Sequence, residues 1–103
     1  MANYCLYILS SRHHRHLSIG VTPDLASGIG NQRMMVRRRL HKKRVLQKLV
    51  YVETIDCVGE AAEREVKLKR APRNQINKLV ESVTPGWNSI SVRALVAAGF
   101  SRS

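Results

Sequence analysis

The sequence lacks an uninterrupted run of about 18 apolar residues, the length that a membrane-spanning helix needs. Its first residues, MANYCLY, lack the basic-then-apolar order of a secretory signal peptide. We therefore expect a cytoplasmic protein without a transmembrane segment. Internal repeats and low-complexity tracts are also missing, while an apolar fraction of 44% is ordinary for a folded chain. With 103 residues, the chain is expected to form one domain with a modest core.

Cysteine is scarce, with Cys5 and Cys57 as the only two. Each lies in an apolar context typical of a strand or a strand edge. Cysteines of a cytoplasmic protein most often pack as small hydrophobic side chains. We expect that role for both, with a disulfide or a catalytic thiol as the less favoured alternatives.

Acidic residues are also few: seven Asp/Glu stand against eighteen Lys/Arg, which gives a net charge of +11 and a pI near 10.7. An excess of this size repels itself in the compact state and is usually kept for a polyanionic partner. Nucleic acid is the favoured partner. An anionic membrane surface is disfavoured, because the sequence shows no long basic amphipathic helix with aromatic anchors.

Most of the positive charge is concentrated in residues 33–48, RMMVRRRLHKKRVLQK, which hold eight cations and no acid. Uncompensated cations at this density favour a phosphate-facing role over a solvated loop. Five of the eight are arginines, whose planar guanidinium suits bidentate phosphate contacts. No aromatic residue is interleaved for base stacking. The candidate nucleic-acid-binding residues of this segment are Arg33, Arg37, Arg38, Arg39, Lys42, Lys43 and Arg44.

A second basic stretch, RHHRH at residues 12–16, adds Arg12 and Arg15 to the candidate nucleic-acid-binding residues. Its His14-Arg15-His16 order contains a His-x-His pair of the kind that binds zinc. No cysteine or acidic ligand is close by in the sequence. We therefore favour a pH-tunable extension of a phosphate-binding surface over a zinc site.

Three segments have the composition of strands. The predicted strands are residues 4–9, 17–22 and 48–55. The first is almost wholly apolar, which predicts a strand buried on both faces. In the third, alternation places Leu49, Tyr51 and Glu53 on one face.

The predicted helices are residues 24–32, 59–70 and 74–83. Thr22 is the expected N-cap of the first helix, which two glycines weaken by about 0.5–1 kcal/mol each. The second is the strongest, and its spacing turns Glu65 inward or into a cleft, on the face of Ala61 and Leu68. The order β-β-α-β-α-α predicts an α+β fold, a three-stranded antiparallel sheet packed by helices.

Five segments occur in the order that is typical of small stand-alone GIY-YIG nuclease domains, and the chain resembles that superfamily. The segments are LYIL, LSIGVTPDL, KLVYVETID, EAAEREVKLK and TPGWNSI. The fourth is similar to the family helix pattern Ala-x-x-Arg-Glu-x-x-Leu-Lys, and the fifth to the closing Asn-Pro-x-Trp. The resemblance implies a GIY-YIG-like domain over residues 1–89, with residues 33–48 as a basic insert and residues 90–103 as a tail or short helix.

The resemblance also implies a site for the hydrolysis of a nucleic-acid phosphodiester. In the family, this chemistry uses a divalent metal ion held by a carboxylate. Tyr7 matches the tyrosine that activates the water, and Gly20 matches a glycine where the backbone is approached closely. Glu65 matches the metal-binding glutamate, for Mg²⁺ or Mn²⁺. The alternative, independent of the family, is that Tyr7 is a core aromatic and Glu65 pairs with Lys69 one turn later.

Four other family positions are altered. The second-motif tyrosine is Ser18, and the asparagine before the closing proline is Thr84. The phosphate-steadying arginine is Gly28, and the histidine one turn later is Gln32. By analogy with oxyanion-hole donors, losing one preorganised charge lowers the rate by a factor on the order of 10²–10³. We therefore expect a nuclease-like fold that binds nucleic acid, DNA or RNA, without cutting it and without a cofactor.

Two alternatives stay open at this point. One is a metal-dependent endonuclease in which Arg33 or one of residues 37–39 replaces the missing arginine. The other is an interaction subunit of a larger assembly, whose basic segment orders on an acidic protein surface or on RNA.

Overall fold

The structure, a computed structural model, describes residues 4–11, 15–24, 48–91 and 94. Its elements are strands β1 (Tyr4–Ser10), β2 (Leu17–Thr22) and β3 (Lys48–Ile55) and helices α2 (Val58–Arg70) and α3 (Arg73–Glu81). The strands form one antiparallel sheet, so the predicted α+β class with a three-stranded antiparallel sheet is confirmed. The helix predicted at residues 24–32, the basic segment up to residue 47 and most of residues 90–103 lie outside the described residues.

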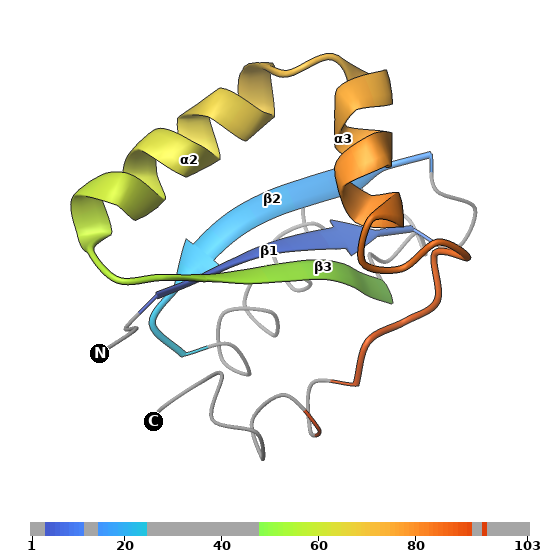
Figure 1. The fold of residues 1–103 in the computed structure, drawn as a ribbon, viewed down its shortest axis with the longest axis horizontal. Coiled ribbons are helices and arrows are strands. Elements are labelled where there is room, and N and C mark those ends of the chain that lie inside the picture. The colour runs from blue at the N-terminus through green and yellow to red at the C-terminus, as the bar shows by residue number, and fades with distance from the viewer. Residues whose placement is uncertain (1–3, 12–14, 25–47, 92–93, 95–103) are drawn as a thin grey trace, which may run out of the picture.

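Strand β1 is the central strand, with β2 and β3 on its two sides (Figure 1). All its residues from Cys5 to Ser10 are buried, as the apolar run predicts. At the end of β2, Oγ1 of Thr22 accepts a hydrogen bond from the backbone N–H of Asp24 (3.1 Å), which is the bond that an N-cap side chain makes.

A β-bulge in β3 overturns the predicted alternation of its side chains. Ile8 of β1 pairs with Tyr51, whereas the next residue, Leu9, pairs with Leu49, so Val50 is the extra residue. An extra residue reverses the face on which the neighbouring side chains lie. Leu49 therefore packs in one core cluster and Tyr51 in the other, instead of sharing a face.

Helices α2 and α3 lie on the same side of the sheet (Figure 1). On this side, Leu6 and Ile8 of β1 pack in one core cluster with Ala61 and Leu68 of α2 and Val80 of α3. All five are buried, and Leu6 and Ile8 are fully enclosed. These contacts hold α2 against the sheet through Ala61 and Leu68.

The opposite face of β1 carries a second, smaller cluster of buried residues. Cys5, Tyr7 and Leu9 pack there with Leu49 of β3. Partly buried Ile90 joins them, and its backbone N–H donates to the carbonyl of Leu49 (2.7 Å). The chain beyond α3 thus returns to the outer edge of β3.

Helix α2 begins at Val58, because Cys57 caps it. The Sγ atom of Cys57 accepts a hydrogen bond from the backbone N–H of Glu60 (3.4 Å). Cys57 is exposed, so the prediction that it packs as a hydrophobic side chain is wrong. Cys5 is buried as predicted, and both cysteines are free thiols.

Helix α3 ends at Glu81, two residues earlier than predicted. Val83 consequently lies beyond the helix and is 50% exposed rather than part of its apolar face. Trp87 then turns back into the helix-side core with a backbone φ of 57°. Its indole Nε1–H donates to Oε2 of Glu81 (3.0 Å), which ties the turn to the end of α3.

Candidate functional site

Tyr7 and Gly20 lie opposite each other across β1 and β2. A Cβ atom added at Gly20 would lie 2.5 Å from Oη of Tyr7 and 2.6 Å from Cζ. Both distances are far inside the normal contact distance of about 3.5–4.0 Å between carbon atoms. The tyrosine ring therefore occupies the space that any side chain at position 20 needs, and glycine is required for the ring to lie where it does.

Glu65, on α2, forms an ion pair one turn along the same helix. Its Oε2 lies 3.0 Å from Nζ of Lys69, and the two side chains are 29% and 55% exposed. This is the i, i+4 pair that the local spacing predicts. Pairs as exposed as this one contribute at most about 1 kcal/mol, so Lys69 holds the carboxylate only weakly.

Tyr7 of β1 and Glu65 of α2 lie near enough for the charge of the carboxylate to act on the tyrosine hydroxyl. Burial raises the pKa of the Tyr7 hydroxyl, and the negative charge of Glu65 raises that pKa further. A raised pKa keeps the hydroxyl protonated, and in this form it donates a hydrogen bond rather than removing a proton from water. The proximity of these two residues is therefore compatible with the family site, whereas the electrostatics disfavour Tyr7 as a base.

Two of the four altered positions, Ser18 and Thr84, lie within the described residues. Ser18 lies in β2 opposite Leu9. The Thr84 hydroxyl forms hydrogen bonds with the carbonyls of Val50 (2.8 Å) and Val80 (3.2 Å), and so connects the end of α3 to β3. Gly28 and Gln32, at the positions of the family arginine and histidine, lie outside the described residues.

The donor set around Glu65 is a poor fit for a divalent metal ion. Glu65 supplies one carboxylate, and Lys69 pairs with it. Across the described part of the chain, no three His, Cys, Asp or Glu side chains come together in a group that would hold a metal. A cation next to the carboxylate competes electrostatically with the metal, so we derive no metal-dependent step from this arrangement.

A second tyrosine and glutamate form a network that the sequence analysis missed. Arg64 of α2 donates to both carboxylate oxygens of Glu53 in β3, at 3.0 Å from Nε and 3.3 Å from Nη2. The Tyr51 hydroxyl donates to the same carboxylate (2.5 Å). Burial and the interaction with Glu53 raise the pKa of Tyr51 to about 12. The hydrogen bond to Glu53 also raises the pKa of Arg64, so at neutral pH the Tyr51 hydroxyl stays protonated and the Arg64 guanidinium stays charged.

Of the predicted nucleic-acid-binding residues, only Arg15 falls within the described residues, where it is exposed before β2. The other eight lie outside the described residues: Arg12, Arg33, Arg37, Arg38, Arg39, Lys42, Lys43 and Arg44. Two other cations, Lys69 and Arg73, line a pocket of about 460 Å³ beside Ser18 and its neighbours in β2. Their proximity depends on the sharp connection between α2 and α3, which residue spacing does not reveal.

Comparisons with protein-family models, with curated proteins and with solved structures return no match to this chain. The resemblance to GIY-YIG domains therefore rests on the five segments quoted above. Among the described residues, no helix is long and apolar enough to cross a membrane.

Proposed function

We propose that this protein binds nucleic acid through its phosphates, on a sheet domain related to the GIY-YIG nucleases, without cutting the strands. The observation that carries the proposal is the uneven distribution of charge. The described residues contain all seven acids and eight of the eighteen Lys/Arg, so this part of the molecule is almost neutral. The surplus comes instead from acid-free sequence, above all residues 33–48.

A phosphate-directed surface predicts a particular dependence on salt. Each phosphate contact releases condensed counterions, so affinity falls with a log–log slope of about −0.9 per contact on duplex DNA. Six contacts, from Arg37, Arg38, Arg39, Lys42, Lys43 and Arg44, would lower the affinity about 10³-fold between 50 and 200 mM salt. Phosphate contacts carry no sequence information, so sequence preference should be weak.

The test is a salt titration of fluorescent duplex DNA, single-stranded DNA and RNA against the wild-type protein and two triple variants. Replacing Arg37, Arg38 and Arg39 by Gln should reduce the magnitude of the slope by about 3. The matched control replaces Lys67, Arg70 and Lys78, on α2 and α3, by Gln and should leave the slope nearly unchanged. A wild-type affinity that barely changes with salt, or equal effects of the two triple variants, would contradict the proposal.

A metal-dependent endonuclease is the second candidate, and one observation favours it. Tyr7 and Glu65, from β1 and α2, lie close enough for the carboxylate to affect the pKa of the hydroxyl. Strand cleavage that requires Mg²⁺ or Mn²⁺ and disappears in Glu65→Gln would support this candidate over the first.

The cytoplasmic location expected from the sequence stays a prediction.

A further inference from the structure

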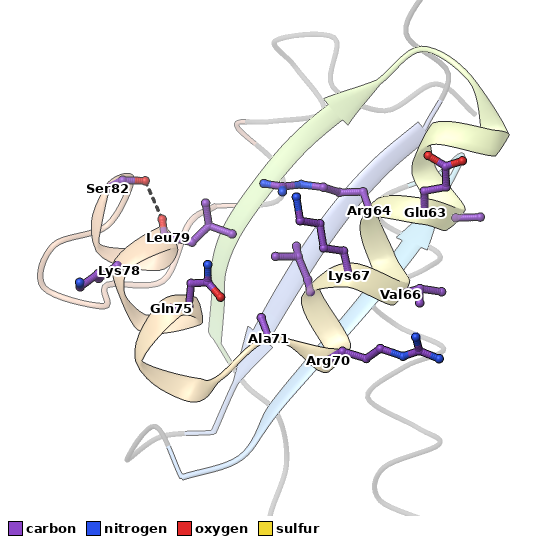
Figure 2. A pocket seen from close by; sticks show the side chains of 12 residues that line it. Glu63, Arg64, Val66, Lys67, Arg70, Ala71, Gln75, Lys78, Leu79 and Ser82 are labelled. Atoms are coloured by element: carbon purple, nitrogen blue, oxygen red, sulfur yellow. Dashed lines mark hydrogen bonds between the residues drawn. The ribbon is translucent and has the colours of Figure 1, made fainter.

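A groove of about 1010 Å³ lies between α2 and α3 (Figure 2). Its apolar lining consists of Ala62, Val66, Leu68, Ala71 and Leu79. Val66 is 48% exposed, and Leu79 is only partly covered by the core. Figure 2 shows Leu79 pointing from α3 into the space between the two helices. The helices thus leave apolar side chains uncovered where they diverge.

Positive charge surrounds this apolar lining. Four cations line the groove, namely Arg64, Lys67, Arg70 and Lys78, against one acid, Glu63. Arg64 forms an ion pair with Glu53 of β3. The other three cations form no ion pair with an acidic side chain of the described residues. Figure 2 shows Lys67 reaching from α2 toward α3, alongside Arg64.

We infer that this groove binds an acidic amphipathic helix of a partner protein. An α-helix is about 10 Å wide and seats one apolar stripe in a groove of this kind, with anchors at i, i+3 or i+4 and i+7. Carboxylates that flank the stripe would face Lys67 and Lys78, which have no ion-pair partner among the described residues. Complementary charge sets the specificity and the association rate, and the apolar contact supplies the affinity.

Other occupants match the groove less well. Residues 92–103 of the chain itself contain two arginines and no acid, so their charge has the same sign as that of the groove. A second copy would present helices of the same positive sign, since α3, RNQINKLVE, has two cations, Arg73 and Lys78, and one acid, Glu81. Nucleic acid matches the charge, but a phosphate backbone would leave the apolar lining of the groove without an apolar partner.

The test uses a fluorescein-labelled peptide of about 16 residues, long enough to populate a helix when bound, with leucines on one face and glutamates flanking them. A scrambled peptide of the same composition is the control ligand. The amphipathic peptide should bind at least about tenfold more tightly than the scrambled one, a difference of about 1.4 kcal/mol. Equal binding of the two peptides, or no binding of either, overturns the inference.

Two protein variants locate the binding surface. Lys67→Glu reverses a charge in the groove and should weaken peptide binding about tenfold. Arg15→Glu makes the same charge change at an exposed position before β2, away from the groove, and should change binding less than about twofold. Leu79→Ser should also weaken binding, and circular dichroism checks that each variant is folded. If Lys67→Glu and Arg15→Glu have the same effect, the inference is wrong.

A competition arm separates the groove from the proposed nucleic-acid surface. A DNA or RNA duplex of about 20 base pairs should bind Lys67→Glu almost as well as it binds wild type. The reason is that the proposed phosphate contacts lie in residues 33–48. If instead the oligonucleotide displaces the peptide and binds Lys67→Glu about tenfold more weakly than wild type, the groove is a nucleic-acid site and the inference fails. Neither result decides the proposed function, because the salt titration tests the contacts of residues 33–48 separately.

Discussion

Two carboxylates, Glu53 of β3 and Glu65 of α2, each raise the pKa of a tyrosine, and they differ in what else binds them. In the Tyr51–Glu53 pair, Arg64 binds both oxygens of Glu53 and the Tyr51 hydroxyl donates to one of them. Glu65 acts on Tyr7 through its charge, and its ion-pair partner is one exposed lysine, Lys69, one turn along the helix. The Glu53 network therefore connects β3 and α2, whereas the ion pair of Glu65 lies within α2.

This difference separates structural from functional use of the same residue types. The Glu53 network joins the helix to the sheet, since its members come from both elements. The Glu65–Lys69 ion pair joins no two elements, because both residues belong to α2. The ion pair of Glu65 is therefore expected to add little to the stability of the fold, and a role of Glu65 in a site stays a prediction. Four predictions test this comparison.

The largest effect is expected from Glu53→Gln compared with Glu65→Gln. Glu53→Gln removes the charge that Arg64 and Tyr51 bind, and hydrogen bonds to a charged group are worth about 1.5–3 kcal/mol. We expect a loss of about 2 kcal/mol in the free energy of unfolding, against less than about 1 kcal/mol for Glu65→Gln. Urea unfolding of both variants measures the difference. Equal losses would mean that the two carboxylates are equally structural.

Gly20→Ala tests whether the position of Tyr7 depends on glycine. The added methyl group would overlap the buried ring, and overpacking of this kind destabilises by about 1–3 kcal/mol. In a Tyr7→Ala background, Gly20→Ala should leave the free energy of unfolding nearly unchanged, because the ring that the methyl group would overlap is absent. A double-mutant cycle measures the coupling, and additive effects of the two substitutions would contradict the contact.

Alkaline pH should weaken the Tyr51 network. Folding raises the pKa of Tyr51 from 10.0 to about 12, so the folded state holds this proton more tightly than the unfolded state. The resulting stability is complete below pH 10 and is lost as the pH rises through about 12. Chemical unfolding at a series of pH values should show this decline, with a smaller decline in Tyr51→Phe. The same slope in both proteins would rule out Tyr51 as its source.

The smallest effect is expected from Lys69→Gln. An exposed i, i+4 pair contributes about 0.3–0.5 kcal/mol and is screened by salt. Unfolding free energies of wild type and Lys69→Gln should therefore differ by no more than this at low salt and converge at 1 M salt. A loss above about 1 kcal/mol would show that Lys69 does more than pair with Glu65.

The sheet was predictable from the sequence because its strands are short β-rich runs with clear ends. The bounds of β2 and β3 match the predicted ranges, and β1 is one residue longer. The bulge at Val50 was not predictable, since residues 49–52, LVYV, are all apolar and suit either register. The exposure of Cys57 followed from its role as a helix cap, which its apolar neighbours in the sequence conceal.

The candidate site was only partly accessible to the same reasoning. The ion pair of Glu65 with Lys69 follows from helical spacing, whereas the proximity of Tyr7 and Glu65 was expected only from the family resemblance. The Glu53–Arg64 pair joins residues eleven apart on different elements, which no local periodicity connects. The groove between α2 and α3 likewise depends on how the two helices diverge after Ala71.

The most direct test of the central claim reads binding and cleavage from the same sample. Wild-type protein and Glu65→Gln are each incubated with labelled nucleic acid and Mg²⁺ or Mn²⁺, binding is measured by anisotropy, and the sample is then run on a denaturing gel. The account predicts that both proteins bind with similar affinity and that every strand stays intact. Strands cut by the wild type and left whole by Glu65→Gln would contradict it and establish the endonuclease instead.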